Sequence, residues 1–287
     1  MDSTTLRTFL TVVETGSLVR AATRLNVTPS TVTTRLSALE RKLGQELLIR
    51  RKSGAELTSA GFKFLRYAQL MTDLWRQARQ EAALPAEMES VCNLGCHFDL
   101  WAGVGRAFFE RLRTDHPRVA VAAWPGEQPD MDRWLGSGLV DAVFCYSPSL
   151  REPWTAQPLG ADRLVLVSTV PRGRVRWDSR YVYVDFGEAF RRAHATAYPD
   201  GDTPTVVFGC AAWALDHILA WGGSAYLPDR LAKPHIAAGR LHPVPDTPTF
   251  ERTAYFVADK TAAARWPWLE TLLADVRLDR PDPAGSC

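Results

Sequence analysis

The sequence has few cysteines and no long apolar run, and these two absences exclude whole classes of protein. Its 287 residues include five cysteines, an odd number: Cys92, Cys96, Cys145, Cys210 and Cys287. Because no secretion signal accompanies them, we expect reduced thiols rather than a disulfide framework. No stretch approaches the roughly 20 consecutive apolar residues that a membrane helix needs, and the start, MDSTTLRTF, has no basic-then-apolar signal pattern. The protein is therefore expected in the cytoplasm, with no membrane partner.

Motifs of enzymes and of metal or nucleotide sites are also missing. The sequence contains no GxSxG, HExxH or GxxxxGK[ST]. Cys92, Cys96 and His97 are followed by no second Cys/His pair at ligand spacing, so a four-ligand zinc site cannot be completed locally. Gly103 and Gly105 fall inside a predicted helix, without the strand-turn-helix context of a dinucleotide fingerprint. We therefore expect no enzyme activity, no cofactor and no metal.

The composition is that of a folded protein with more than one core. Hydrophobic residues make up 46% of the chain and charged residues 23%, which is ordinary for globular proteins, and the length exceeds a single domain of about 150 residues. The net charge of +2 conceals an asymmetry, because residues 1–60 hold nine Lys and Arg against five Asp and Glu, a balance of +4. A basic first segment favours a nucleic-acid-binding module joined to a different kind of domain.

Helix signals with tight joints occupy the first 60 residues. Gly16 ends an apolar helical run, and Ser17 is placed to cap the next helix. Thr28 as N-cap and Pro29 at the first helical position then start a third helix after a short turn. One side of that helix is an apolar stripe at spacings of 4, 3 and 4, made of Val32, Leu36, Leu39 and Leu43. Gly44 follows the helix end, and LLIRRKSGAELT predicts a small basic hairpin, or wing.

This arrangement is suited to double-stranded DNA. A second helix held at a fixed angle by the first fits the major groove, which is about 12 Å wide, and its first residues then meet base edges. The wing would bring Arg50, Arg51 and Lys52 to the phosphates. A helix-turn-helix that mediates only protein contacts is the alternative.

A long helix is predicted over residues 60–83, ending before Pro85. It carries an apolar stripe at spacings of 4, 3, 4, 3 and 4, made of Phe64, Ala68, Met71, Trp75, Ala78 and Ala82. This heptad pattern favours a dimer seam between two copies of the helix. The alternative is that the stripe packs on its own chain.

From about residue 90 the pattern changes to apolar runs that alternate with helical stretches, which predicts parallel strands with crossover helices. The predicted strands are 90–96, 118–124, 141–146, 163–170, 181–185, 204–208, 224–227 and 251–258. The predicted helices are 100–114, 129–136, 187–197, 210–221, 228–237 and 263–276. GCHFDLW at 95–101 and GCAAW at 209–213 each run from a strand into a helix, where anions and polar ligands bind. We expect a small-molecule crevice lined by Cys96, His97, Phe98, Ser168, Thr169, Cys210 and Ala211.

A segment of about 55 residues, from Phe9 to Gly61, resembles the winged helix-turn-helix of LysR-type transcriptional regulators. The resemblance rests on the ETGS run at 14–17, the Ala21-Ala22 pair, Leu39-Glu40, Leu43-Gly44, Arg50, and the pairs at 57–58 and 60–61. The reading helix departs from the family, which usually shows Gln-Pro at its start and Arg one turn later; here those places hold Pro29, Ser30 and Thr34. The residues expected at the DNA are Ser17, Thr28, Pro29, Ser30, Thr31, Thr33, Thr34, Arg35, Arg50, Arg51 and Lys52.

The resemblance implies an α/β fold class with three parts. These are a winged helix-turn-helix at 1–59, a linker and dimerisation helix at 60–89, and a two-lobed effector domain at 90–287 that resembles periplasmic binding proteins. Lobe I would take about 90–161 and 247–287, and lobe II about 162–246. The implied function is sequence-specific transcriptional regulation controlled by a small molecule between the lobes, in a homodimer or homotetramer, with RNA polymerase as a further partner.

Two other functions stay open at this stage. Cys96 and Cys210 would flank the crevice near helix N-termini that lower a thiol pKa, which would suit a redox sensor. A cytoplasmic solute-binding protein would explain only the body of the chain.

Overall fold

The computed structural model describes residues 3–51, 54–149, 151–171 and 178–278. The chain divides into two compact units, Met1–Ala86 and Glu87–Cys287. Each unit has its own hydrophobic core.

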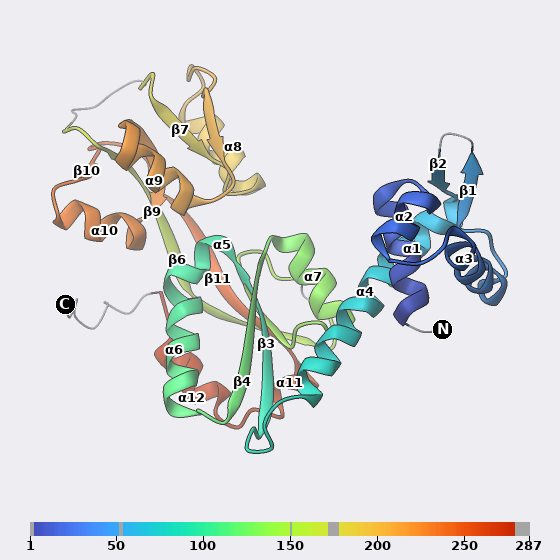
Figure 1. The fold of residues 1–287 in the computed structure, drawn as a ribbon. Coiled ribbons are helices and arrows are strands. Elements are labelled where there is room, and N and C mark those ends of the chain that lie inside the picture. Colours follow the sequence, from blue (N-terminus) through green and yellow to red (C-terminus); the bar gives the residue numbers. More distant parts are fainter. Residues whose placement is uncertain (1–2, 52–53, 150, 172–177, 279–287) are drawn as a thin grey trace. The chain divides into compact units, whose positions relative to one another are not determined.

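The first unit is built of short helices, a hairpin and one long helix. Its elements are α1 (Ser3–Thr15), α2 (Leu18–Arg24), α3 (Pro29–Leu43), β1 (Leu48–Arg51), β2 (Gly54–Leu57) and α4 (Ser59–Ala82). The predicted caps are confirmed, since the Ser17 hydroxyl accepts from the Arg20 N–H and the Thr28 hydroxyl from the Thr31 N–H. Gly44 ends α3 in the left-handed conformation that its missing side chain allows, at φ +66°. β1 and β2 pair antiparallel and form the predicted wing (Figure 1).

The first half of α4 packs on the core of its own unit. Ala68 is fully buried, and Phe64 meets Phe9 of α1 edge to face with ring centroids 5.4 Å apart. Met71 also packs against this core. Three of the six residues predicted for the dimer seam therefore have partners within the chain. Of the other three, Trp75 is 55% exposed, and Ala78 and Ala82 are exposed as well.

The second unit contains one mixed sheet with helices on its faces. Its strands are β3 (Ser90–His97), β4 (Val119–Gly126), β5 (Ala142–Cys145), β6 (Trp154–Ser168), β7 (Tyr181–Val184), β8 (Val206–Phe208), β9 (Ser224–Pro228), β10 (His242–Pro243) and β11 (Phe250–Asp259). Its helical segments are α5 (Phe98–Leu100), the π-turn η1 (Trp101–Gly105), α6 (Arg106–Asp115), α7 (Gln128–Ser137), α8 (Glu188–Ala197), α9 (Ala211–Trp221), α10 (Asp229–Ala237), α11 (Lys260–Ala263) and α12 (Leu269–Asp275). The strand order is β4-β3-β5-β11-β6-β9-β7-β8, with β10 beside β6.

Two long antiparallel strands, β6 and β11, pass through both lobes of this unit (Figure 1). On β6, Leu159 belongs to the core of lobe I and Leu164 to that of lobe II. On β11 the change falls between Phe250, which packs in lobe II, and Ala254, which is buried in lobe I. The prediction of parallel strands is right for β3, β4 and β5 and for β7, β8 and β9. The prediction is wrong for β6 and β11, which pair antiparallel with each other. The chain passes from lobe I to lobe II along β6 and returns along β11, so the two strands run in opposite directions.

Three predicted elements differ from those observed. The strand predicted at 163–170 begins earlier, at Trp154, because its first half crosses between lobes. The helix predicted at 100–114 is interrupted at Ala102 and Gly103, whose backbone angles are not helical, so Gly103 is not inside a regular helix. The helix predicted at 263–276 begins later, at Leu269 (α12), and the separate short helix α11 ends at Ala263; Pro267, which cannot donate an N–H, lies between them.

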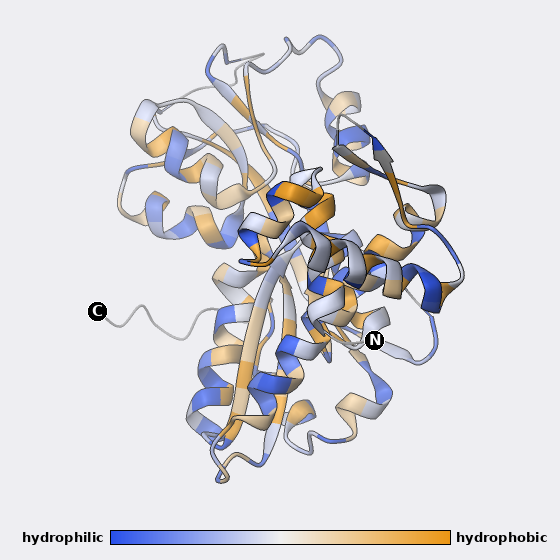
Figure 2. Cartoon of the chain, turned by 45° about the vertical axis from the view of Figure 1, so that its right-hand side comes forward, coloured by the Kyte–Doolittle hydropathy of each residue, from blue (hydrophilic) through white to orange (hydrophobic). Residues whose placement is uncertain are grey.

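The helices of both units are amphipathic, and Figure 2 shows orange and blue segments alternating along them. No helix within the described ranges combines the length and apolarity needed to cross a membrane. The four described cysteines are buried free thiols.

The start of α4 predicts a strict requirement for glycine at position 61. A Cβ added to Gly61 would lie 2.1 Å from the Leu47 carbonyl oxygen, a backbone atom. Gly61→Ala should therefore lower the free energy of unfolding of the first unit by about 1–3 kcal/mol, measured by urea unfolding of the full chain. Gly209→Ala is the matched control, because its Cβ would meet nothing within 4 Å and its backbone is not left-handed. Equal stability of both variants would contradict the expectation.

Candidate functional site

A cluster of buried charged side chains lies between the two lobes of the second unit. Asp99 comes from α5, directly after β3, and Asp162 and Arg252 come from the crossing strands β6 and β11. Arg230 comes from α10 of lobe II. The side chains of Asp99 and Asp162 are only 1% and 2% exposed, and that of Arg252 is 10% exposed. We call these four residues the interlobe cluster.

Asp162 is the most heavily bonded member. Its Oδ2 accepts from the Tyr146 hydroxyl at 2.6 Å, and its Oδ1 pairs with Arg230 Nε at 3.0 Å. Arg252 Nη2 lies 3.4 Å from Oδ2. Burial raises the pKa of Tyr146 well above its usual range, so its hydroxyl stays protonated and donates.

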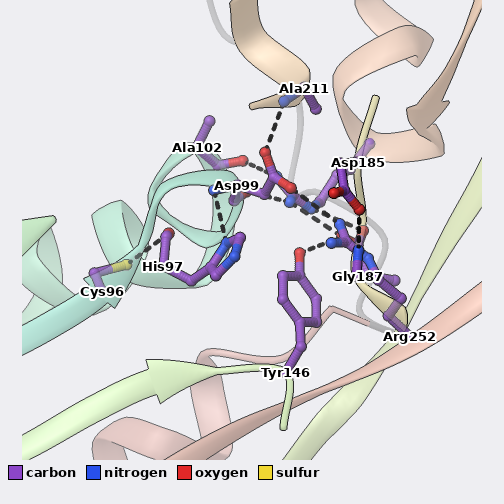
Figure 3. Close-up of polar contacts among 11 residues, drawn as sticks. Cys96, His97, Asp99, Ala102, Tyr146, Asp185, Gly187, Ala211 and Arg252 are labelled. Carbon is purple, nitrogen blue, oxygen red and sulfur yellow. Dashed lines mark hydrogen bonds and ion pairs between the residues drawn. The ribbon is translucent and has the colours of Figure 1, made fainter. Parts of the chain in front are cut away.

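Asp99 joins lobe I to lobe II. Its Oδ1 accepts the backbone N–H of Ala211, the first residue of α9, at 2.8 Å, and its Oδ2 pairs with Arg252 Nη2 at 3.2 Å (Figure 3). Arg230 reaches in the opposite direction and donates to the backbone oxygens of Asp99 and Ala102. The interlobe space therefore holds two carboxylates and two guanidinium groups that neutralise one another.

Arg252 lies against two aromatic rings. Its guanidinium carbon lies 3.8 Å from the centroid of Tyr146 and 4.3 Å from that of Phe186. Both contacts are favourable cation–π interactions for a buried guanidinium, whose N–H groups remain the donors for hydrogen bonds. Its Nε is buried and has no hydrogen-bond partner among the residues that the structure describes. A buried donor of this kind is costly unless something accepts from it.

His97 supports the position of Asp99. Its Nδ1 accepts from the Asp99 N–H at 3.2 Å, and its ring meets Tyr146 edge to face. Burial lowers the pKa of His97, which favours the neutral ring whose Nδ1 lone pair this hydrogen bond uses.

The crevice residues predicted from sequence divide into two groups. Ala211 and His97 contact Asp99, Phe98 is its neighbour in α5, and Cys210 is the N-cap residue of α9. Ser168 and Thr169 lie elsewhere, at the opposite edge of lobe II. Ser168 pairs with Ser224 at the start of β9, whereas the interlobe cluster lies near the end of β9, because β6 and β9 are antiparallel. We therefore correct these two assignments.

Cys96, which the sequence predicted in the lining of the crevice, is a third difference. Its side chain is buried in the lobe I core, with Sγ 3.5 Å from the His97 carbonyl oxygen, and it makes no contact with the four residues of the interlobe cluster in Figure 3. Burial raises the pKa of the Cys96 thiol to about 12, opposite to the lowering expected at a helix N-terminus. A thiol that stays protonated is a poor nucleophile, so the geometry speaks against redox sensing by Cys96.

Sequence reasoning missed all four members of the interlobe cluster. Asp99 stands inside the motif GCHFDLW, but only its neighbours were selected. Asp162 is buried on β6 between two exposed neighbours and shares its face with Leu164, and a charge on the buried face of a strand is a signal that a partner lies nearby. Arg252 is its register partner on β11. Within the described ranges, no group of three or more His, Cys, Asp or Glu side chains could hold a metal ion.

The residues predicted at the DNA lie along α3 and the wing. Ser30 and Thr34 are exposed on α3, and Thr31 and Thr33 are half-buried. The Thr28 hydroxyl lies 2.8 Å from those of both Ser30 and Thr31, so the start of α3 presents a cluster of hydroxyl groups.

The Arg and Lys residues predicted at the DNA have different surroundings in the structure. Arg35 donates from Nη1 to Thr8 of α1 at 3.3 Å, which ties its side chain to the first helix. Arg51 is exposed and pairs with Glu56 across the hairpin. Lys52 lies outside the described residues, and the side chain of Arg50 is likewise not described. Ser17 serves as the N-cap of α2.

Two family models match the chain. The model described as bacterial regulatory helix-turn-helix protein, lysR family, matches residues 3–62. The model of the LysR substrate binding domain matches residues 94–274, which include every member of the interlobe cluster.

Individual proteins are similar over nearly the whole chain. The HTH-type transcriptional regulator HdfR of Shigella boydii is 28% identical over 272 residues, covering 92% of this chain and 96% of HdfR. The solved structure of full-length CbnR complexed with its target DNA has a TM-score of 0.71 at 19% identity and covers 96% of this chain and 100% of CbnR. LysG from Corynebacterium glutamicum with bound effector Arg has a TM-score of 0.53 at 20% identity and covers 98% of this chain and 100% of LysG. At these identities the two solved structures show a shared fold.

The hydrogen bond to His97 predicts a pH dependence of stability. Below pH about 6.5 the unfolded chain binds a proton on this histidine more readily than the folded chain, whose His97 pKa is lowered. The free energy of unfolding should therefore fall as the pH drops from about 7 to about 5. In His97→Asn, which keeps an acceptor for the Asp99 N–H but does not titrate, the fall should be smaller. Tryptophan fluorescence measures it well, since nine of the ten Trp lie in residues 87–287. Identical pH profiles for variant and wild type would refute the role.

Proposed function

Because the chain belongs to the LysR family of DNA-binding transcriptional regulators, we propose how its own residues divide the family's work. The surface of α3 and the wing contact double-stranded DNA, the exposed part of α4 joins two chains, and the interlobe cluster receives a small-molecule effector. The protein acts in the cytoplasm, where bacterial DNA is, and has no catalytic role. The observation that carries the proposal is the intact helix-turn-helix with its wing, in a chain whose second unit matches the substrate binding domain.

The DNA surface combines hydroxyl groups on α3 with cations on the wing. Ser30, Thr33 and Thr34 offer hydroxyl and methyl groups that suit base edges, including the thymine methyl. No residue of α3 before Arg35 carries a charge, so discrimination rests on short side chains. Arg51, together with Arg50 and Lys52, supplies contacts to phosphates that do not depend on sequence.

Wing and reading-helix variants should therefore affect DNA binding differently. Arg51→Ala or Lys52→Ala should weaken binding to all sequences and reduce the salt slope by about 1. Thr33→Ala should change the preference among sites by about 1 kcal/mol, because it removes a base contact. Binding titrations at several salt concentrations, on a selected site and on random DNA, measure both effects. Arg192→Ala in α8, an exposed cation of the second unit, is the matched control and should change neither.

An unaltered salt slope for the wing variants would contradict the phosphate contacts. Unchanged site preference for Thr33→Ala would contradict base reading by α3. These two results are independent, so each part of the surface can fail alone.

The exposed end of the α4 stripe is the proposed dimer seam. Trp75 is a large apolar side chain exposed on a helix, and Ala78 and Ala82 continue its stripe at helical spacing. Dimerisation would cover this surface. Two such dimers pairing through their effector domains would make a tetramer, and RNA polymerase would be a further partner at the promoter. The stripe itself supports only the dimer.

Trp75→Glu should weaken self-association by about tenfold or more, because it would bury an unpaired charge in the seam. Phe62→Glu is the matched control, since Phe62 lies on the same helix, is 67% exposed and falls outside the stripe. Sedimentation velocity over a concentration series measures the shift. Met71→Glu is a poorer probe, because Met71 also packs on the core of the first unit. A dimer unaffected by Trp75→Glu, or affected equally by Phe62→Glu, would place the interface elsewhere.

The effector site is proposed at the interlobe cluster rather than along the full predicted crevice. Of the residues predicted from sequence, His97, Phe98, Cys210 and Ala211 stay in this proposal, and the cluster adds Asp99, Tyr146 and Arg252. The support is local: a helix N-terminus, an arginine with a free buried donor and two aromatic rings meet at one point between the lobes. A ligand bound there would touch both lobes and both crossing strands.

A further inference from the structure

We propose that the carboxylate of Asp99 is an internal ligand, which fills a carboxylate site on lobe II and the crossing strand β11, and that a small carboxylate effector acts by displacing it. This inference rests on the proposed effector site and names both the ligand class and the mode of regulation. In the effector-free chain, the protein's own side chain would close the site.

The contacts of Asp99 are those of a bound carboxylate. One oxygen takes the N–H that begins α9, where the helix dipole favours a negative charge, and the other pairs with Arg252. Neither Ala211 nor Arg252 lies on the element that carries Asp99. The side chain is therefore held by a site built on other parts of the unit, as a ligand would be.

A second observation shows that this site has unused binding capacity. Arg252 Nε is buried and has no acceptor among the described residues, although the side chain is nine-tenths buried and its guanidinium lies against two rings. Asp99 and Asp162 both use Nη2 of this arginine. A carboxylate that is free of the α5 backbone can approach Nε and Nη2 together, in the two-bond geometry that arginine prefers. A free acid thus gains a hydrogen bond that tethered Asp99 does not make.

The charge balance selects an anion. The cluster contains two carboxylates and two guanidinium groups, so an incoming cation would add a buried charge without a partner. A carboxylate that replaces Asp99 leaves the number of buried charges unchanged. The exchange also breaks the link from α5 to α9, and with it the arrangement in which Arg230 holds the Asp99 and Ala102 carbonyl groups. The preferred arrangement of the lobes would then depend on which carboxylate is bound.

The experiment uses acetate as the probe and the full chain with Asp99→Ala, which vacates the site. Acetate should raise the Tm of this variant in a saturable manner and bind it about tenfold or more tightly than wild type, because the variant lacks a tethered competitor at high effective concentration. Acetamide, the neutral analogue of the same shape, should have no effect. Asp115→Ala in α6, which removes an exposed carboxylate of the same lobe, should respond to acetate as wild type does. Adding Arg252→Lys to Asp99→Ala should abolish the response, because lysine keeps the charge but lacks Nε.

Several results would overturn the inference. These are equal acetate responses of wild type and Asp99→Ala, an equal effect of acetamide, and an acetate response that survives Arg252→Lys. If Asp99→Ala does not fold, Asp99→Asn takes its place, since it keeps the shape and removes the charge; it too should bind acetate more tightly than wild type, and failure to do so refutes the proposal.

DNA binding by the same preparations separates this inference from the proposed function. Salt-dependent DNA binding without an acetate response in the Asp99 variants would remove the internal ligand and leave the regulator intact. An acetate response in a chain that binds no DNA would refute the DNA-binding function and leave the internal ligand intact.

Discussion

The second unit depends on the neutralisation of charges that two shared strands bury between the lobes. Asp162 on β6 and Arg252 on β11 stand where the strands pass from one hydrophobic core to the other. A carboxylate this deeply buried is tolerated only with close partners. Tyr146 from lobe I and Arg230 from lobe II supply them, so the lobes meet through a polar cluster rather than an apolar interface.

The interruption of the helix after β3 follows from the same junction. A regular helix from residue 98 onward would keep its carbonyl groups within the helix. The non-helical angles at Ala102 and Gly103 instead leave carbonyl groups without a helical partner. Arg230 of lobe II donates to two of them, those of Asp99 and Ala102. Gly103 has no side chain, and an added Cβ would lie 3.1 Å from Arg230 Nη1, so glycine permits the close approach. The short segment that carries Asp99 is therefore shaped by contacts from the other lobe.

In the first unit, one helix combines two tasks along its length. The first turns of α4 complete the core formed by α1, α2 and α3, through Phe64 and Ala68. Beyond Met71 the same apolar stripe emerges from that core and becomes exposed at Trp75. A heptad pattern records only that a face is apolar, and it does not distinguish a partner in the same chain from a partner in another copy. The position of the core along α4 makes that distinction.

The sequence alone determined the parts of this protein whose signals are contiguous. Caps at Ser17 and Thr28, Pro29 at a helix start and Gly44 at a helix end act within a few residues, so the helix-turn-helix, its wing and the family resemblance could all be read directly. Most strands and helices of the second unit followed from periodicity in the same way. Only the tertiary structure decided the direction of β6, which moved Ser168 to the far edge of lobe II, and the meeting of residues 99, 162, 230 and 252. Side-chain periodicity is the same for parallel and antiparallel strands, so it does not give the direction of a strand. A charged residue in a predicted strand likewise does not show which residue will pair with it. The partner is fixed by how the chain returns between the lobes.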